Sequence, residues 1–184
     1  MNNSLWRNKY EKQVKSVVVC DGVFSIGGNA FCDCMNMNSV VLPNSVTSIG
    51  DEAFKHCYSL KSIIIPESVE TIGYRAFLVC RFSSITIPRA FISFGGNPFS
   101  ECPFLKVIDV SENPNFAFVD EVLIDKRTSQ IVFCVLSKSG NYDIPSTVVS
   151  IGKGAFNGCT KLTSINIPDS VTFIDEEAFC RCIW

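Results

Sequence analysis

The sequence contains a single histidine and no long apolar run, and each of these absences argues against a class of protein. Enzymes need acid, base or nucleophilic groups that converge. The lone His56 lies at a variable position between Lys55 and Cys57, where a surface residue is expected. The longest apolar runs, such as 63–65 and 131–136, are far too short to span a bilayer. We therefore expect neither catalysis nor a membrane-spanning segment.

A strong net charge and a glycine-rich phosphate loop are also missing. The formal net charge of −2 gives no bulk attraction to nucleic acid or to anionic lipid. The glycine pairs Gly27–Gly28 and Gly95–Gly96 fall at the same bend of a repeated unit. The sequence therefore predicts no nucleic-acid partner and no cofactor.

The N-terminus lacks the apolar segment of a secretory signal peptide, because MNNSLWRNKYEKQ is polar. The sequence stops at Trp184, two residues after Cys182 and in the middle of a repeat. Solenoids need capping ends, so this ending favours a fragment of a longer protein. A signal would then lie elsewhere, and a cytoplasmic protein is the alternative.

The sequence does have a unit of 23 residues that recurs along most of its length. It is typified by Leu60–Cys80, LKSIIIPESVETIGYRAFLVC, in which a cysteine follows the Ala-Phe pair by three residues. Repeats of this period are the signature of a solenoid. The pair falls at Ala30/Phe31, Ala53/Phe54, Ala76/Phe77, Ala155/Phe156 and Ala178/Phe179, with Pro98/Phe99 once at a spacing of 22.

Each unit has two halves. The first has the pattern apolar-x-x-apolar-x-apolar, usually closed by proline, and its β-branched residues at period 2 predict a short strand. The second ends in a one-turn spacing for which we expect a 3₁₀ or single α turn. In the typical unit the predicted core is Leu60, Ile63, Ile65, Val69, Ile72, Ala76, Phe77 and Cys80.

Ten cysteines would suggest disulfides in a small secreted chain, but six of them occupy one position of the repeat. A thiol in register with a core phenylalanine is expected to be a small buried group. The pairs Cys32/Cys34 and Cys180/Cys182 are weak metal signals without a nearby histidine, so we predict no metal site. The six repeat cysteines are Cys34, Cys57, Cys80, Cys102, Cys159 and Cys182.

The period breaks once, between Phe99 and Phe156. Two β-rich runs, 119–124 and 130–136, flank the polar stretch 125–129, which predicts a hairpin that replaces the helical turn of one coil. Two interpretations remain open. The hairpin is either a local elaboration of the convex side or a binding feature.

The recurring string x-L-x-S-I-x-I-P-x-S-V-x-x-I-G-x-x-A-F-x-x-C resembles the BspA-like class of leucine-rich repeats over residues 14–182. The resemblance implies an α/β solenoid: a right-handed coil with a parallel β-sheet on the concave face, short helical turns on the convex side and one β-hairpin insertion. It also implies adhesion or protein recognition, often at a cell surface. We expect one domain, 1–184, with an N-terminal cap (1–13), regular repeats (14–110), a long variant coil with the hairpin (111–138) and regular repeats (139–184), the last incomplete.

Alternation along the predicted strands assigns the residues that face solvent. Three of them, Val18, Val41 and Ile64, form an apolar stripe, which is either a contact site or a consequence of strand propensity. We expect a protein ligand, with an extracellular-matrix or host surface protein possible, to bind the concave face between this stripe and an acidic end. The candidate residues are Val18, Val41, Lys61, Ile64, Thr86, Lys106, Asp109, Asp143 and Asn166.

Two alternatives to a secreted or cell-surface adhesin are kept. The same fold serves intracellular scaffolds, because fold does not decide function. Self-association is the other alternative, since the uncapped C-terminal edge at 165–167 could pair with a second copy.

Overall fold

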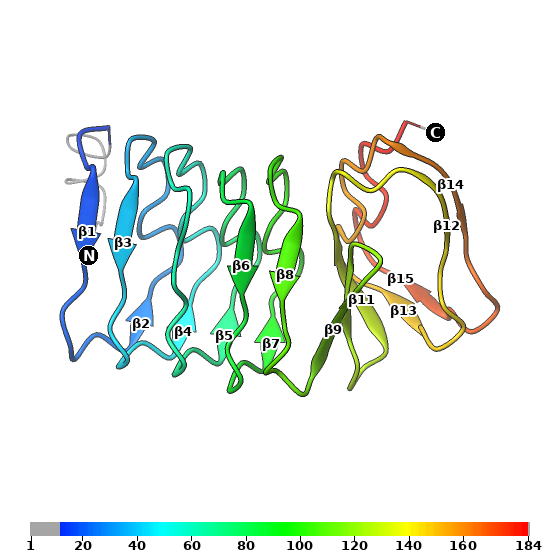
Figure 1. Ribbon diagram of the computed structural model, residues 1–184, viewed down its shortest axis with the longest axis horizontal. Coiled ribbons are helices and arrows are strands. Elements are labelled where there is room, and N and C mark those ends of the chain that lie inside the picture. The colour runs from blue at the N-terminus through cyan, green and yellow to red at the C-terminus, as the bar shows by residue number, and fades with distance from the viewer. Residues whose placement is uncertain (1–11, 184) are drawn as a thin grey trace.

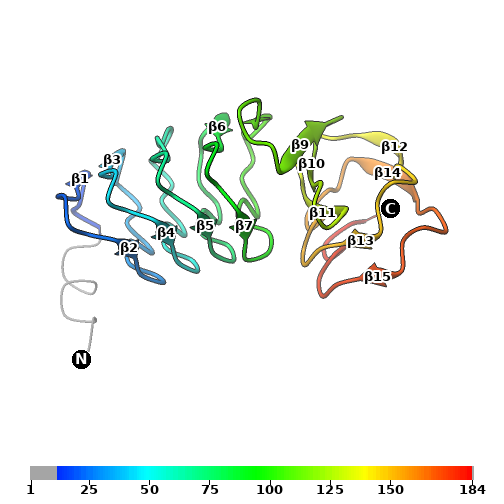
Figure 2. The same cartoon turned by 90° about the horizontal axis from the view of Figure 1, so that it is seen from below.

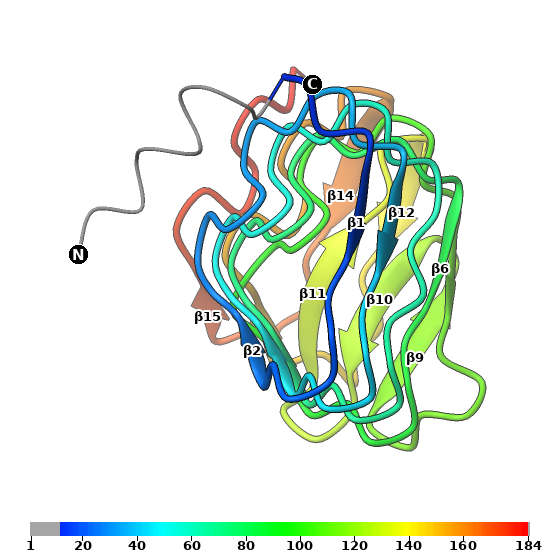
Figure 3. The ribbon, with the colours of Figure 1, turned by 90° about the vertical axis from the view of Figure 1, so that its left-hand side faces the viewer.

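The structure, a computed structural model, describes residues 12–183. The predicted cap at 1–13, with Trp6 and Tyr10, lies almost wholly outside these residues. The chain winds into a solenoid whose coils lie side by side along the long axis, with β1 at one end and β14 and β15 at the other (Figure 1). Viewed along that axis, the coils superimpose on one another (Figure 3).

The first strand of each coil comes from the predicted apolar-x-apolar stretch, and neighbouring strands pair in parallel with like residues opposite one another. In this first strand row the middle side chain points inward, as Val40, Ile85 and Ile108 do. The row comprises β1 (Ser16–Val18), β3 (Ser39–Val41), β6 (Ser84–Thr86), β8 (Val107–Asp109), β12 (Gly140–Asp143) and β14 (Leu162–Asn166).

The first strand row is not the continuous sheet that the sequence predicts. It consists of three two-stranded sheets, β1-β3, β6-β8 and β12-β14. Within the described residues, the segment 62–65 pairs with neither β3 nor β6, although its pattern is the most regular of all. The hairpin insertion separates β8 from β12 (Figure 1).

A second strand row was missed because each strand has only two residues, which is too short for a periodic signal. The sheet β2-β4-β5-β7 pairs in parallel through the Ser/Thr-Ile dipeptides, with isoleucine or phenylalanine turned inward. This row runs along the solenoid opposite the first one (Figure 2). Its members are β2 (Ser25–Ile26), β4 (Ser48–Ile49), β5 (Thr71–Ile72), β7 (Ser93–Phe94), β13 (Ser150–Ile151) and β15 (Phe173–Ile174).

The glycine that follows β4, β5, β7 and β13 allows the coils to approach closely. A Cβ atom on Gly73 would lie 2.5 Å from the backbone nitrogen of Asp51, and one on Gly50 would lie 2.6 Å from that of Gly28. Real side chains do not fit at such distances. The glycine of this repeat position was expected to permit a bend, but the φ of Gly73 is not positive, so the space between coils is what requires glycine here.

The prediction of a 3₁₀ or α turn in each coil is wrong, because no helix occurs in residues 12–183. The segment is a series of tight turns in which Arg75 (φ 51°) and Val79 (φ 62°) adopt left-handed backbone that a right-handed helix excludes. Consecutive N–H groups then alternate in direction. Those of Ala76, Leu78 and Cys80 bond within the coil, and those of Arg75, Phe77 and Val79 donate to the next coil at 2.9–3.2 Å.

The core is a ladder of phenylalanine rings with one ring per coil. Phe31, Phe54, Phe77 and Phe99 stack at centroid distances of 5.3, 5.5 and 5.9 Å. Phe156 and Phe179 form a second stack at 5.4 Å. Of the predicted core of the typical unit only Ile63, on the unpaired segment, is half-buried, and the other seven residues are buried.

The insertion is a three-stranded antiparallel meander of β9 (Phe116–Val119), β10 (Val122–Asp125) and β11 (Gln130–Cys134). The pair β10-β11 is the hairpin that the sequence predicts. The strand β9 was missed because its turn, Asp120-Glu121, has positive φ at both residues without the usual glycine. Beyond the meander β11 pairs in parallel with β13, so the second strand row resumes.

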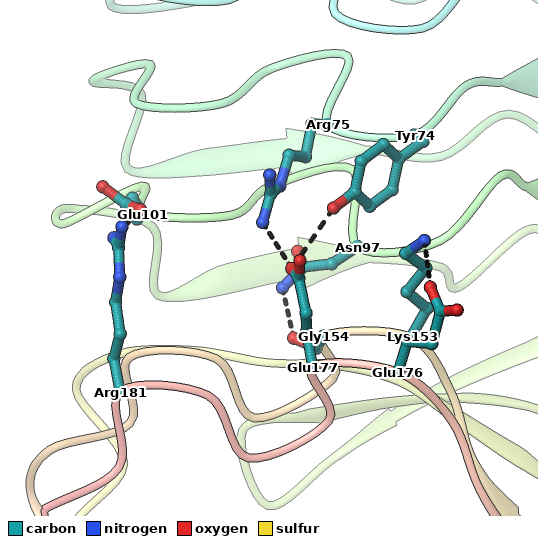
Figure 4. Close-up of polar contacts among 9 residues, drawn as sticks. All are labelled: Tyr74, Arg75, Asn97, Glu101, Lys153, Gly154, Glu176, Glu177 and Arg181. Atoms are coloured by element: carbon teal, nitrogen blue, oxygen red, sulfur yellow. Dashed lines mark hydrogen bonds and ion pairs between the residues drawn. The ribbon is translucent and has the colours of Figure 1, made fainter.

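The meander leaves no Ala-Phe turn in its own coil, so turns far apart in sequence become neighbours (Figure 4). The amide of Asn97 donates to the carbonyl of Gly154 at 2.6 Å, and both groups are buried. Around it Arg75 pairs with Glu177 at 2.6 Å, and Arg181 pairs with Glu101. We call the tight turns of successive coils the turn row. Side chains therefore join the parts of the turn row before and after the meander, whereas backbone hydrogen bonds join neighbouring turns elsewhere.

The phenylalanine ladder gives a direct stability test. Phe77→Ala removes a ring that is 0% exposed and touches both neighbouring rings, so we expect a loss of about 3–5 kcal/mol in the free energy of unfolding. The control Phe24→Ala removes a ring that is 67% exposed and should change stability by less than about 0.5 kcal/mol. Urea denaturation followed by circular dichroism measures both. A loss below about 1 kcal/mol for Phe77→Ala would contradict the ladder.

Candidate functional site

The nine predicted binding residues are all exposed. Ile64 is the most exposed apolar side chain of the described residues at 86%, followed among these positions by Val18 at 70% and Val41 at 53%. Each lies beside inward-pointing neighbours on its strand or segment. A β-branched side chain this exposed gains nothing from burial, so its position is compatible with a contact surface.

Two hollows on the first strand row bring the apolar candidates together. Val18 and Val41 line one of about 550 Å³ with Leu42 and Pro43. Ile64 and Thr86 line another of about 380 Å³, which lies between the unpaired segment and β6. The missing sheet pairing at 62–65 therefore coincides with a depression on the surface.

The acidic candidates lie apart from this stripe. Asp109 faces Thr86 across β6-β8, whereas Asp143 faces Asn166 across β12-β14. The backbone N–H of Ser111 donates to Asp109 at 3.0 Å and lowers the pKa of that carboxyl group. The nine residues thus do not form one continuous surface, because the meander divides the row.

A third hollow, of about 750 Å³, lies where the chain enters the first strand row, and we call it the rim groove. Lys61 is the only one of the nine predicted residues in it. The other members were not predicted: Asn38 and Ser83 share the repeat position of Lys61, and the rest lie in the connecting loops. The rim groove is lined by Asn38, Tyr58, Ser59, Lys61, Arg81, Ser83 and Phe104.

His56 forms the one close histidine–carboxylate contact of the described residues. Its Nδ1 lies 2.7 Å from Oδ1 of Asp33, and its ring stacks on Tyr58 at 5.6 Å. Burial raises the pKa of Asp33, but hydrogen bonds from His56 and Cys32 outweigh it and lower the pKa overall.

In residues 12–183 no three His, Cys, Asp or Glu side chains converge as a metal site would require. Nor does that part of the chain contain a helix able to cross a membrane.

The repeat cysteines are packed against the coil that precedes them. The thiols of Cys57, Cys80 and Cys102 donate to the carbonyls of Phe31, Phe54 and Phe77 at 3.1–3.3 Å. Burial raises the pKa of Cys102 to about 12 and that of Cys80 well above the ordinary value. These thiols therefore remain protonated at neutral pH, which deprives them of nucleophilic character.

The sequence matches the BspA type leucine rich repeat region in six copies, over residues 24–124 and 126–184. The chain belongs to this family. Leucine-rich repeat proteins of this kind generally act in protein interactions. No curated protein sequence shows significant similarity to the chain.

Several solved structures share its fold. A leucine-rich repeat protein from Eubacterium ventriosum is 25% identical with a TM-score of 0.77, over 97% of this chain and 54% of that one. A leucine rich cell surface protein from Faecalibacterium prausnitzii is 31% identical with a TM-score of 0.71, over 91% and 52%. The pneumococcal vaccine antigen PcpA, 19% identical over 85% and 51% with a TM-score of 0.65, shows the fold alone. The chain spans about half the length of these proteins.

The burial of the cysteines predicts their reactivity. Of the ten, only Cys20 and Cys180 are exposed, Cys182 is half-buried and the other seven are buried. Titration of the reduced, folded protein with Ellman's reagent should show rapid reaction at Cys20 and Cys180 alone, and full reaction only in denaturant. The variant Cys20→Ser/Cys180→Ser should abolish the rapid phase. Rapid modification of Cys80 or Cys102, detected by mass spectrometry, would contradict the packing described above.

Proposed function

We propose that the chain is a non-catalytic protein-binding domain that recognises a protein ligand through the first strand row. The observation that carries this proposal is the exposure of Val18, Val41 and Ile64 on one side of the solenoid, next to two surface hollows. Exposed apolar residues that gather on a surface favour a contact site. The membership of a family that generally binds proteins supports the same conclusion.

The ligand is a protein outside the cell in this proposal. The relative from Faecalibacterium prausnitzii is described as a cell surface protein, which favours adhesion or recognition of an extracellular-matrix or host surface protein. The alternative is an intracellular scaffold of the same fold. The compartment of the full-length protein, determined by fractionation, distinguishes the two.

Replacement of two apolar candidates tests the proposal. Val41→Lys/Ile64→Lys places two charges on the proposed surface and should abolish binding, because a buried unpaired charge is costly at an interface. The measurement is capture of the chain by an array of purified extracellular-matrix and host surface proteins.

The matched control is Val119→Lys/Val149→Lys, which adds the same charge at exposed valines away from the first strand row. It should bind as the unmodified chain does, and both variants should keep its circular dichroism spectrum. Equal binding by the Val41/Ile64 variant and the unmodified chain would exclude the first strand row as the binding surface.

A second candidate function is self-association through the C-terminal edge. β14 and β15 each have a neighbour on one side only within the described residues, and Phe173 and Ile174 on β15 are 55% and 48% exposed. An unpaired apolar edge is a template for pairing with a second copy. We expect multi-angle light scattering to show a dimer that Phe173→Lys/Ile174→Lys converts to monomer. A monomer at all concentrations of the unmodified chain would exclude this candidate.

A further inference from the structure

The rim groove exists because one connecting loop is a residue shorter than its neighbours. Two residues lie between Cys57 and Leu60 and between Cys102 and Leu105, but only Arg81 lies between Cys80 and Phe82. Tyr58 in the preceding loop and Phe104 in the following loop line the rim groove together with Arg81 in the short one. This single deletion also accounts for the one spacing of 22 among the Ala-Phe pairs, since the period is 23 on both sides of it.

The short loop also differs from the regular loops in its backbone hydrogen bonds. In the regular loop Tyr58 N–H donates to its own coil, to the carbonyl of His56 at 2.9 Å. In the short loop Arg81 N–H donates to Leu60 of the preceding coil at 3.3 Å. The two loops are thereby joined, and the side chains of Tyr58 and Arg81 line the same groove.

The charges in the rim groove are of one sign. Lys61 and Arg81 line it, no carboxylate does, and among residues 12–183 neither cation has an ion-pair partner. Arg75, Arg127 and Arg181 pair with carboxylates, whereas Arg89, like Arg81, has no ion pair among residues 12–183. An unpaired guanidinium group beside a lysine is suited to bind a carboxylate through two hydrogen bonds.

Two aromatic rings, those of Phe104 and Tyr58, lie beside the cations of the rim groove and have fixed packing partners. The guanidinium carbon of Arg81 lies 4.9 Å from the ring centroid of Phe104. The ring of Tyr58 stacks on His56, which in turn is held by Asp33. Tyr58 and Phe104 remain 37% and 44% exposed. They therefore offer apolar surface next to the cations, and little side-chain freedom is lost when a ligand binds.

We propose that the rim groove binds an acidic peptide segment of the protein partner, with a Glu or Asp carboxylate held by Arg81 and Lys61. The inference rests on the proposed function, which it deepens by naming the chemistry of the partner. Two cations fit one or two carboxylates, whereas a nucleic acid or a long sulfated glycan needs a series of positive charges. The apolar rings and the neighbouring hollow at Ile64 suit the mixed side chains of a peptide.

The test uses the purified chain and a random heptapeptide phage library. Selected peptides should be enriched in Asp and Glu, and the enrichment should disappear with Lys61→Gln/Arg81→Gln. The control Lys126→Gln/Lys161→Gln removes two exposed positive charges elsewhere, one of them in the loop equivalent to that of Tyr58, and should retain it. Peptides without acidic enrichment, or equal selection by the Lys61/Arg81 variant, would overturn the proposal.

A second variant tests the groove itself and not only its charge. Insertion of one serine between Arg81 and Phe82 restores the loop length of the neighbouring coils while both cations remain. Fluorescence polarisation with the most enriched peptide should show at least about tenfold weaker affinity for the insertion variant and for Lys61→Gln/Arg81→Gln. Affinity should also fall as the salt concentration rises. Unchanged affinity of a folded insertion variant would exclude the groove.

The outcomes separate this inference from the proposed function. If acidic peptides bind the groove but no protein of the array is captured, the proposed function fails and the groove assignment stands. If capture depends on Val41 and Ile64 but not on Arg81, the groove assignment fails alone. Binding of a sulfated heparin oligosaccharide in place of acidic peptides, lost in the Lys61/Arg81 variant, would overturn the peptide assignment.

Discussion

The structure depends on the backbone hydrogen bonds that pass from each turn to the next coil. In the typical coil the donors are the N–H groups of Arg75, Phe77 and Val79. The left-handed backbone at residues 75 and 79 directs these groups toward the next coil. A helix would use the same groups internally and leave this segment of one coil joined to that of the next by side chains alone. The turns instead fix the distance between coils, which in turn sets the stacking of one phenylalanine ring on the next at 5.3–5.9 Å. Thiol donors from the repeat cysteines reinforce the same interface.

Departures from this periodic arrangement account for most of the distinctive surface. The meander interrupts the turn row, so that Asn97, Arg75 and Glu101 bond across to residues 154, 177 and 181 (Figure 4). It also divides the first strand row. A regular solenoid offers the same face at each coil, so selective recognition requires positions that differ. The unpaired segment 62–65 and the short loop at Arg81 are such positions, and they are adjacent in space because both flank β6.

The sequence predicted the features that recur and missed those that depend on contacts between coils. The spacing of phenylalanine and cysteine identified the core, since a buried residue in one coil requires a buried one in the next. The same spacing suggested a helix at 74–80, because a run of tight turns also brings residues three and four apart to one side. The φ angles of Arg75 and Val79 and the hydrogen bonds from this segment to the next coil distinguish the two. The Asp120-Glu121 turn carries no glycine, so β9 had no detectable boundary.

In the candidate site, too, the sequence predicted the features that recur and missed those that depend on neighbouring coils. Strand alternation placed Val41 and Ile64 on the surface, because side-chain direction follows from the backbone alone. The rim groove depends on a loop that lacks one residue, and that deletion is visible in the sequence only as the change of spacing from 23 to 22. The side chains that border the shortened loop line the groove, as Tyr58 and Phe104 do here. In a repeat protein the irregular spacings are therefore the positions at which to look for a binding site, and the chemistry of their borders, here Arg81 and Lys61, indicates the kind of ligand.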